Sequence, residues 1–253
     1  MTFRVATYNV LATGYIRPRF YPYCDPAHLD ARWRLPALVR HCVALDADLV
    51  GMQEVDRATY AALDEVLAPL GYAGSYAPKG GDKPDGCATF HRRAVFSSRQ
   101  VERLAYRDGS DHIALLTLFE QAGRALGLAN THLKWAPPGT THDLDQIREL
   151  LDALSAPERV GAEWIICGDF NAKPDSPVLA ALAAAGYGPS HSGAAQGPTC
   201  NPNGAAKTID YLCHGAGLRS SPRPLPRIDD RTPLPSAEQP SDHLAVMADF
   251  MPA

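Results

Sequence analysis

One stretch constrains the fold of this chain more than any other, the run from Trp164 to Asn171. Its apolar residues end at Gly168, which predicts a buried strand followed by a sharp turn. Asp169 and Asn171 lie two positions apart, so a backbone that stays extended would point both side chains the same way. A carboxylate and an amide at the carboxyl end of a buried strand are typical of an active site. The alternative is a local turn in which Asp169 caps the backbone.

The size, charge and cysteine content of the chain favour some classes of protein over others. Its 253 residues are 45% hydrophobic and 21% charged, with no Ser/Gly linker, which predicts one domain over residues 1–253. The formal net charge of -4 favours a small or short anionic substrate over long duplex nucleic acid. No apolar run reaches the roughly 18 residues of a membrane span. Together with six scattered cysteines, this predicts a cytoplasmic protein with no membrane partner and no obligate protein partner.

Hydrophobic periodicity predicts strands that alternate with helices in places and pair directly in others. The arrangement indicates two sheets with helices outside them. The residues between 186 and 206 are rich in Gly, Pro and Asn and are predicted to form a long surface loop. Predicted strands cover residues 3–8, 48–53, 111–119, 124–131, 164–168, 208–213 and 244–250, with further strands within 71–96, and predicted helices cover 29–44, 57–67, 144–154 and 177–185.

Polar residues stand at the ends of most of these strands. If the strand ends point the same way, the polar groups converge on one opening. Carboxylates with few thiols or histidines at ligand spacing suit Mg²⁺ rather than zinc. Two histidines with carboxylate partners suit transition-state stabilisation, so the set predicts attack of water on phosphorus with metal assistance. The six groups are Asn9, Glu54, His132, Asp169 with Asn171, Asp210, and Asp242 with His243.

Each of these residues has a structural alternative when it is taken singly. Asp210 and Asp242 could cap turns, and His132 could be a hydrogen-bonded core histidine. Jointly, the structural explanation requires six coincidences along the chain.

The motifs in this order resemble the endonuclease/exonuclease/phosphatase superfamily, which includes DNase I, exonuclease III and inositol polyphosphate 5-phosphatases. The resemblance covers essentially the whole chain. Within the superfamily, the residues 8–12, 85–90 and 130–133 are most similar to the deadenylase, nocturnin and angel branch. The motifs are Thr7-Tyr8-Asn9-Val10-Leu11, Gln53-Glu54-Val55-Asp56, Asn130-Thr131-His132-Leu133, Gly168-Asp169-Phe170-Asn171, Ile209-Asp210-Tyr211 and Ser241-Asp242-His243.

The resemblance implies a four-layer α-β-β-α sandwich of two packed mixed or antiparallel sheets. It also implies a Mg²⁺ cofactor, with Mn²⁺ as an alternative. Glu54 would be the principal metal ligand, Asn9 would support metal and phosphate, and Asp242 would contribute to the metal site.

Catalytic roles are implied in the same way. Asp169 would orient or deprotonate the attacking water, and Asn171 would hold a phosphoryl oxygen. His132 would donate to the phosphoryl oxygens. His243 would bind the phosphate, with its imidazole fixed by Asp210.

Substrate contacts are less constrained by the sequence. Aromatic and arginine residues between 14 and 26 suit stacking on a base and pairing with a phosphate, although they could also plug the end of the core. The glycine-rich segment 78–86 carries two lysines that could touch phosphate, or could be a solvated hairpin tip. The candidates are Arg17, Arg19, Lys79, Lys83, Lys134 and Trp135.

The predicted function is therefore a Mg²⁺-dependent phosphodiesterase or exonuclease acting on a nucleotide or short oligonucleotide, of the RNA 3′-end type. The alternatives are a phosphomonoesterase acting on a nucleotide, dinucleotide or inositol phosphate, and a scaffold or binding protein with the same fold. One departure from the superfamily bears on the metal count. Position 10 is Val rather than an acid, so the extra carboxylate of some nuclease branches is missing.

Overall fold

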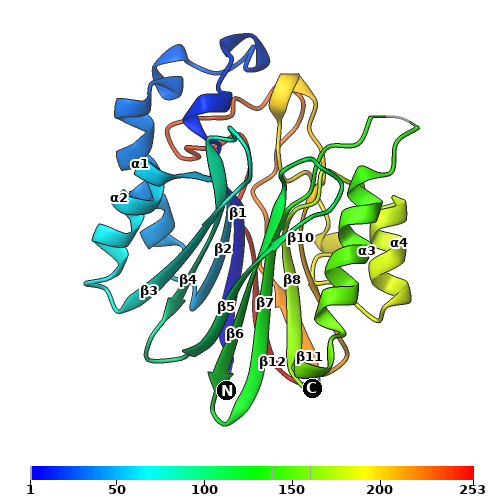
Figure 1. Ribbon diagram of the computed structural model, residues 1–253. Coiled ribbons are helices and arrows are strands. Elements are labelled where there is room, and N and C mark those ends of the chain that lie inside the picture. The colour runs from blue at the N-terminus through cyan, green and yellow to red at the C-terminus, as the bar shows by residue number, and fades with distance from the viewer. Residues whose placement is uncertain (1, 138, 160) are drawn as a thin grey trace.

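Four layers make up the molecule. A computed structural model describes residues 2–137, 139–159 and 161–253. Two six-stranded sheets pack face to face, and a pair of helices covers the outer face of each (Figure 1). The predicted four-layer α-β-β-α sandwich is confirmed. Pro138, in the predicted loop after residue 133, lies outside the described residues.

The first sheet contains both ends of the chain and has the spatial order β11-β12-β1-β2-β4-β3. β1 and β2 are parallel, with Asn9 opposite Gln53, whereas β12 runs antiparallel to β1. The strands are β1 (Phe3–Asn9), β2 (Leu49–Asp56), β3 (Tyr72–Pro78), β4 (Asp85–Arg92), β11 (Leu218–Pro222) and β12 (Val246–Pro252).

The second sheet has the order β5-β6-β7-β8-β10-β9. β7 and β8 are parallel, and His132 pairs with Asp169 at their carboxyl ends. β10 is antiparallel to β8, so its first residue, Asp210, also lies opposite Asp169. The strands are β5 (Ser97–Ala105), β6 (Ile113–Gln121), β7 (Arg124–His132), β8 (Glu163–Asp169), β9 (Gly188–Pro189) and β10 (Asp210–His214).

Among the described residues, three of the four α-helices begin at a capping side chain, which is Asp30, Asp56 or Ser176, whereas the helix that follows Thr141 has no side-chain cap. The Asp56 carboxylate accepts a hydrogen bond from the Thr59 amide at 2.8 Å. The Ser176 hydroxyl accepts one from the Leu179 amide at 3.4 Å at the start of the helix Pro177–Ala184. Figure 1 shows one helix pair on each side of the sheets. The helices are α1 (Ala31–Ala44), α2 (Arg57–Leu67), α3 (His142–Leu154) and α4 (Pro177–Ala184).

The sheets divide the core of the described residues into three large apolar clusters, and a small fourth cluster contains Ala77, Cys87, Ile113 and Leu115. The large cluster between the sheets includes Phe3, Phe119 and Phe250, each at most 2% exposed. The other two large clusters lie under the helix pairs, one between the first sheet and α1 with α2, the other between the second sheet and α3 with α4. Because both faces of the central strands are buried, these strands hold the site residues at their ends on a rigid support.

The structure differs from the predicted elements in three places. β5 and β11 are not predicted by periodicity, since both are polar strands at or next to a sheet edge where burial does not impose alternation. The predicted loop 186–206 contains β9 and two short 3₁₀ turns, at Gly193–Ala195 and Pro202–Gly204. It is not wholly a surface loop, because Thr199, Cys200 and Asn201 are buried.

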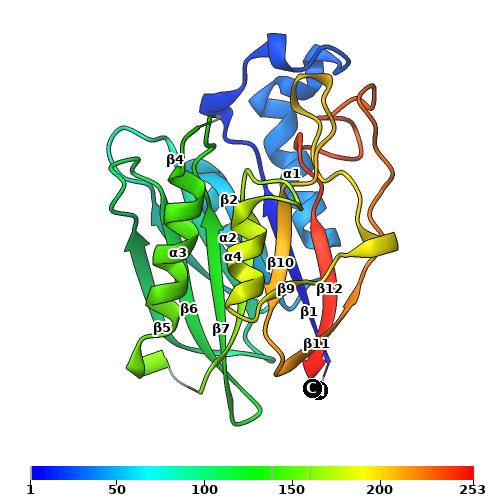
Figure 2. The same ribbon diagram turned by 90° about the vertical axis from the view of Figure 1, so that its right-hand side faces the viewer.

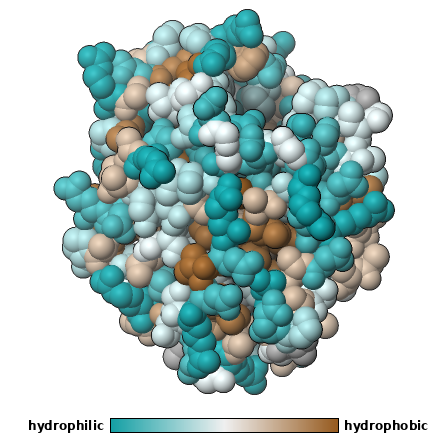
Figure 3. Space-filling model, viewed as in Figure 1, coloured by the Kyte–Doolittle hydropathy of each residue, from teal (hydrophilic) through white to brown (hydrophobic). Residues whose placement is uncertain are grey.

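The parallel pairs in both sheets end at the same end of the molecule. Figures 1 and 2 show that this end carries the long connections, whereas the N- and C-termini lie at the opposite end. Figure 3 shows mostly hydrophilic side chains at the end with the connections, and apolar side chains gathered lower on the same face. Within the described ranges, no helix has both the length and the apolar character needed to cross a bilayer.

Candidate active site

The side chain of Asn9 joins the two sheets at the candidate site. Its Nδ2 donates to Glu54 Oε1 and to Asp169 Oδ2, both at 3.0 Å. The Oδ1 atom accepts from the Leu11 amide at 3.0 Å. Asn9 itself is fully buried. The amide therefore fixes one carboxylate from each sheet in the same small volume.

Glu54 occupies a β-bulge in β2. The register to β4 shifts between Met52 and Val55, and Glu54 has a φ of 56°, in the left-handed region. The bulge turns the carboxylate toward the segment after β1, where the Ala12 amide donates to Oε2 at 2.9 Å. Burial, followed by the charge of Asp242, raises the pKa of Glu54.

These acidic groups fit a divalent cation. Glu54 and Asp242 repel each other, and their carboxylate oxygens are hard donors of the kind that Mg²⁺ prefers. A cation between them would relieve the repulsion. Tyr21 donates to Asp242 Oδ2 at 3.3 Å.

Arg34 and Tyr21 support this side of the site; the sequence reasoning missed Arg34, and it included Tyr21 only among the aromatic residues between 14 and 26. Arg34 comes from α1, is 3% exposed, and donates to the Val10 carbonyl at 2.8 Å and to the Leu11 carbonyl. The segment that supplies the Ala12 amide to Glu54 is thereby held in place. An arginine inside the helical pattern 29–44 was a weak signal, because a surface position is its usual place.

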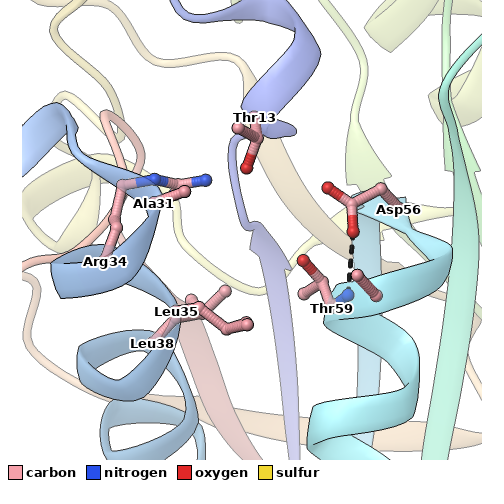
Figure 4. A pocket seen from close by; sticks show the side chains of 8 residues that line it. Thr13, Ala31, Arg34, Leu35, Leu38, Asp56 and Thr59 are labelled. Carbon is pink, nitrogen blue, oxygen red and sulfur yellow. Dashed lines mark hydrogen bonds between the residues drawn. The ribbon is translucent and has the colours of Figure 1, made fainter.

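A separate cavity of about 370 Å³ lies next to Arg34, between α1, α2 and the segment after β1 (Figure 4). The carboxylate of Asp56 is engaged there by the Thr59 amide, and the lower wall is apolar. None of the predicted catalytic residues lines it. The lining residues are Thr13, Ala31, Arg34, Leu35, Leu38, Asp56, Ala58 and Thr59.

The glycine at the end of β8 allows Asp169 to reach the site. Gly168 has a φ of 144°, and a Cβ there would lie 1.7 Å from the Thr131 carbonyl oxygen. Asn171 has a φ of 50°, so the backbone does not stay extended as predicted. Instead, the Asn171 amide donates to Asp169 Oδ1 at 2.9 Å in a tight turn. Burial, followed by the charge of Asp210, raises the pKa of Asp169 to about 7.

His132 lies on one side of Asp169. Its Nε2 is 3.6 Å from Asp169 Oδ2 and 3.1 Å from Asn171 Nδ2, and its Nδ1 is 3.3 Å from Lys79 Nζ. Burial, followed by the positive charge of Lys79, holds the pKa of His132 well below its usual range. The imidazole is therefore neutral.

His243 lies on the other side of Asp169, with its Nε2 3.8 Å from Oδ2. Its Nδ1 is 2.9 Å from Asp210 Oδ2, and the Thr199 hydroxyl donates to that same oxygen at 2.6 Å. Burial alone would lower the pKa of His243, but the carboxylates of Asp210, Asp169 and Asp242 raise it well above its usual range. The imidazole is therefore cationic.

The Cys200 thiol lies close to Asp210 and His243. The ligand atoms of Cys200, Asp210 and His243 lie within 4.8 Å of one another, and all three residues are buried. Such a group could hold a soft metal, a possibility that ligand spacing in the sequence did not reveal. The imidazole and the carboxylate are, however, already engaged with each other.

The structure brings all eight predicted catalytic and metal residues to one end of the sandwich. The predicted substrate contacts differ in their exposure to solvent. Arg17, Arg19, Lys83 and Trp135 are exposed and Lys134 is partly buried, so their role stays a prediction. Arg17 donates to carbonyls of its own loop, at Gly14 and Ile16.

Lys79 fits neither of the two interpretations of its segment, an accessible phosphate contact or a solvated hairpin tip. It is 5% exposed and forms an ion pair of 2.8 Å with Asp85. The sequence motif that begins at Asp85 contained the partner, but the pairing was not foreseen.

Comparisons with known proteins agree with this fold. The sequence model described as "Endonuclease/Exonuclease/phosphatase family" matches residues 6–243. Carbon catabolite repressor protein 4 homolog 3 of Arabidopsis thaliana is 31% identical over 195 residues, which cover 72% of this chain and 42% of that protein. Protein angel homolog 2 of Homo sapiens is 31% identical over 194 residues, covering 70% of this chain and 36% of that protein.

The chain thus spans about two fifths of the length of these curated relatives. Among solved structures, ANGEL2, described as a 2′,3′-cyclic phosphatase in complex with adenosine-2′,3′-vanadate, superposes with a TM-score of 0.85. The superposition covers 99% of this chain and 95% of that one at 23% identity. At this identity, the superposition supports the fold.

Proposed function

The chain belongs to the endonuclease/exonuclease/phosphatase family, a family of phosphoric ester hydrolases, and from that premise we propose that it is a Mg²⁺-dependent phosphodiesterase acting on a nucleotide or short oligonucleotide. One observation carries the proposal. Asp169 Oδ2 lies between the Nε2 atoms of two histidines, at 3.6 and 3.8 Å, and Asn9 ties the same oxygen to Glu54. A proton acceptor, two donors and a metal-ligating carboxylate thus share one volume.

Each residue has a role that its contacts support. Asp169 is held by Asn9 and by the Asn171 amide, so it presents a fixed carboxylate that orients water and takes its proton. His132 and the Asn171 amide lie on the side where a phosphoryl oxygen would accept hydrogen bonds. The His243 cation, fixed by Asp210, stabilises the negative charge that builds on phosphorus.

The cation would be held by Glu54 and Asp242, and Asn9 would support the site by holding Glu54 through its Nδ2. When bound, it supplies Lewis-acid stabilisation of the phosphoryl oxygens. Mn²⁺ has the same preference for oxygen ligands and would substitute.

A second candidate is favoured by one comparison. ANGEL2, which shares the fold, is described as a 2′,3′-cyclic phosphatase. Hydrolysis of a terminal cyclic phosphate uses the same in-line attack on a diester, and the same acceptor and donors would serve it. A phosphomonoesterase remains the third alternative, since leaving-group recognition lies in the loops.

The test is product release from a panel of substrates with Mg²⁺, with Mn²⁺ and with chelator. The panel contains oligoadenylate with a 3′-hydroxyl, an oligonucleotide with a 2′,3′-cyclic phosphate, a 2′-phosphorylated dinucleotide and an inositol polyphosphate. We expect metal-dependent release of nucleoside monophosphate from oligoadenylate. Opening of the cyclic phosphate alone would identify the second candidate, and release of inorganic phosphate alone would identify a monoesterase.

The matched variant is Asp169→Asn, which keeps the size of the side chain and removes the proton acceptor. We expect kcat to fall about 10³-fold or more, because the group acts on the transition state. Near-normal turnover by folded Asp169→Asn protein would sink the proposed mechanism.

A further inference from the structure

A buried row of polar contacts leads from Tyr15 through Asp85 and Lys79 to His132. We infer that Lys79 is a positioning residue that holds His132 as the neutral tautomer carrying its proton on Nε2. The inference rests on the proposed function for its consequence, but its geometry stands apart from any substrate.

Lys79 is enclosed rather than presented to solvent. The side chains of Lys79 and Asp85 are 1% and 0% exposed, and their charged atoms lie 2.8 Å apart. The Tyr15 hydroxyl donates to the other carboxylate oxygen at 2.6 Å. The lysine charge is thus compensated inside the protein, and a role in direct capture of a substrate phosphate does not fit this burial.

The ammonium group settles which nitrogen of His132 carries the proton. Lys79 Nζ has three donors and no acceptor, and it lies 3.3 Å from His132 Nδ1. An attractive contact therefore requires an unprotonated Nδ1. The proton of the neutral ring then sits on Nε2, which faces Asp169 Oδ2 at 3.6 Å.

The opposite tautomer would let Nε2 accept from Asn171 Nδ2 at 3.1 Å. It would, however, point the Nδ1 proton at a buried ammonium ion. In the inferred tautomer, Nε2–H of His132 and the Asn171 amide are two donors that face each other, but both groups are neutral. Contacts to a charged group are about twice as strong as neutral ones, so the Lys79 contact decides the balance.

The inferred tautomer has a chemical consequence. Asn171 Nδ2 donates to the Leu133 carbonyl at 3.0 Å, which fixes the orientation of the amide. Its second hydrogen and the Nε2 proton of His132 then approach each other from nitrogens 3.1 Å apart. A phosphoryl oxygen placed there receives both donors. Without Lys79, part of the His132 population would turn an acceptor toward that oxygen.

The experiment reads the tautomer directly. Protein labelled with ¹⁵N-histidine is studied by long-range ¹⁵N–¹H correlation at neutral pH without metal, and His132 is assigned through His132→Gln. We expect an unprotonated Nδ1 and a protonated Nε2 in the wild type. In Lys79→Met the signal should shift toward a mixture of tautomers, and in Lys79→Arg the Nε2–H form should persist.

Activity provides the second reading, with bis(4-nitrophenyl) phosphate as a general diester probe. We expect kcat to fall about tenfold to a hundredfold in Lys79→Met, with a smaller change in KM and partial recovery in Lys79→Arg. Arg124→Met is the control, because Arg124 is an exposed cation at the opposite end of the same strand, β7. It should leave both the tautomer and kcat unchanged.

Asp85 would be left unpaired in Lys79→Met, so the double variant Lys79→Met/Asp85→Asn replaces it if the single variant fails to fold. An Nδ1–H tautomer in the wild type would overturn the inference even if the protein is an active diesterase. An unchanged tautomer in the Lys79 variants would also overturn it. Conversely, inactivity on every substrate would remove the proposed function and leave the tautomer result standing.

Discussion

His132 and His243 approach the same oxygen of Asp169 from two sides, at 3.6 and 3.8 Å, yet they carry opposite charge states. The pKa of His132 is held well below its usual range, and that of His243 well above it. Both rings are buried, so burial favours the neutral form of each. The difference comes from the nearest charged partner, which is the ammonium of Lys79 for His132 and the carboxylate of Asp210 for His243.

The contrast shows how one residue type serves two purposes around one carboxylate. A cationic imidazole supplies charge as well as a hydrogen bond, whereas a neutral one supplies a directed donor without attracting the base into a salt bridge. Two cations would tie up Asp169, and two neutral rings would leave the developing charge on phosphorus without a protein cation beside it. The pair of environments is therefore a testable property of the site.

The largest expected effect comes from a variant that reduces the positive charge of His243. Asp210→Asn removes the carboxylate that contributes most to keeping His243 protonated, so the imidazole shifts toward its neutral form. We expect kcat to fall about 10³-fold, since charge stabilisation and ring orientation are lost together. Steady-state kinetics with the diester probe would measure it. Thr199→Val keeps the Asp210 carboxylate but removes its 2.6 Å hydrogen bond, together with the bonds that the hydroxyl accepts from the Ile209 and Asp210 amides, and it should cost much less. Equal losses in the two variants would contradict the charge argument.

A smaller effect is expected on the His132 side. His132→Gln retains an amide donor near the position of the ring but loses the fixed direction of Nε2–H. We expect kcat to fall about a hundredfold with little change in the metal concentration for half-activity, because His132 is not among the candidate metal ligands. A titration with Mg²⁺ at saturating substrate would separate the two quantities. A large change in metal requirement with unaltered kcat would instead place His132 in the metal site.

The smallest expected effect concerns stability and tests a residue that packs against His132. His112 packs edge-on against His132, with ring centroids 5.8 Å apart. Burial, followed by the charge of Lys79, lowers the pKa of His112 to about 4. Its unfolded pKa is about 6.5, so between about pH 6.5 and 4 the unfolded chain binds a proton that the folded protein does not.

The stability contributed by neutral His112 is therefore full above about pH 6.5 and decreases as pH falls toward 4. One such proton is worth about 1.4 kcal/mol per pH unit. In His112→Gln the fall in unfolding free energy with decreasing pH should be shallower by up to that slope. Urea denaturation at several pH values would measure it, and a slope equal to that of the wild type would show that His112 takes up its proton in the folded state.

The sequence predicted secondary structure well where interactions between residues close in the sequence determine it. Residues 57–67 were predicted as a helix and form α2 over those positions, because Asp56 caps the start and the apolar spacing selects one face. The end of β1 at Asn9 was also predicted. The strands β5 and β11 were missed, since pairing with a neighbour stabilises a strand whose own side chains carry no alternating pattern.

The sequence predicted which residues form the candidate site, but it did not predict the protonation states of the two histidines. Asp169, Asn171 and both histidines are named by motifs that lie next to strand ends. The extended backbone that would have pointed Asp169 and Asn171 the same way is not formed, because the positive φ of Asn171 makes a turn in which Asp169 accepts a backbone hydrogen bond. Arg34 and Lys79 were missed as supporting residues, since their burial depends on carbonyls and a carboxylate supplied by other segments.

The sequence by itself determined which chemical groups the chain can place at the ends of its strands, because strand and helix periods and capping side chains act over a few residues. Only the tertiary structure decided the proton on each histidine. Lys79 is 53 positions from His132, and Asp210 is 33 positions from His243. Electrostatic effects depend on distance in space and on burial, and both are settled only when the two sheets pack.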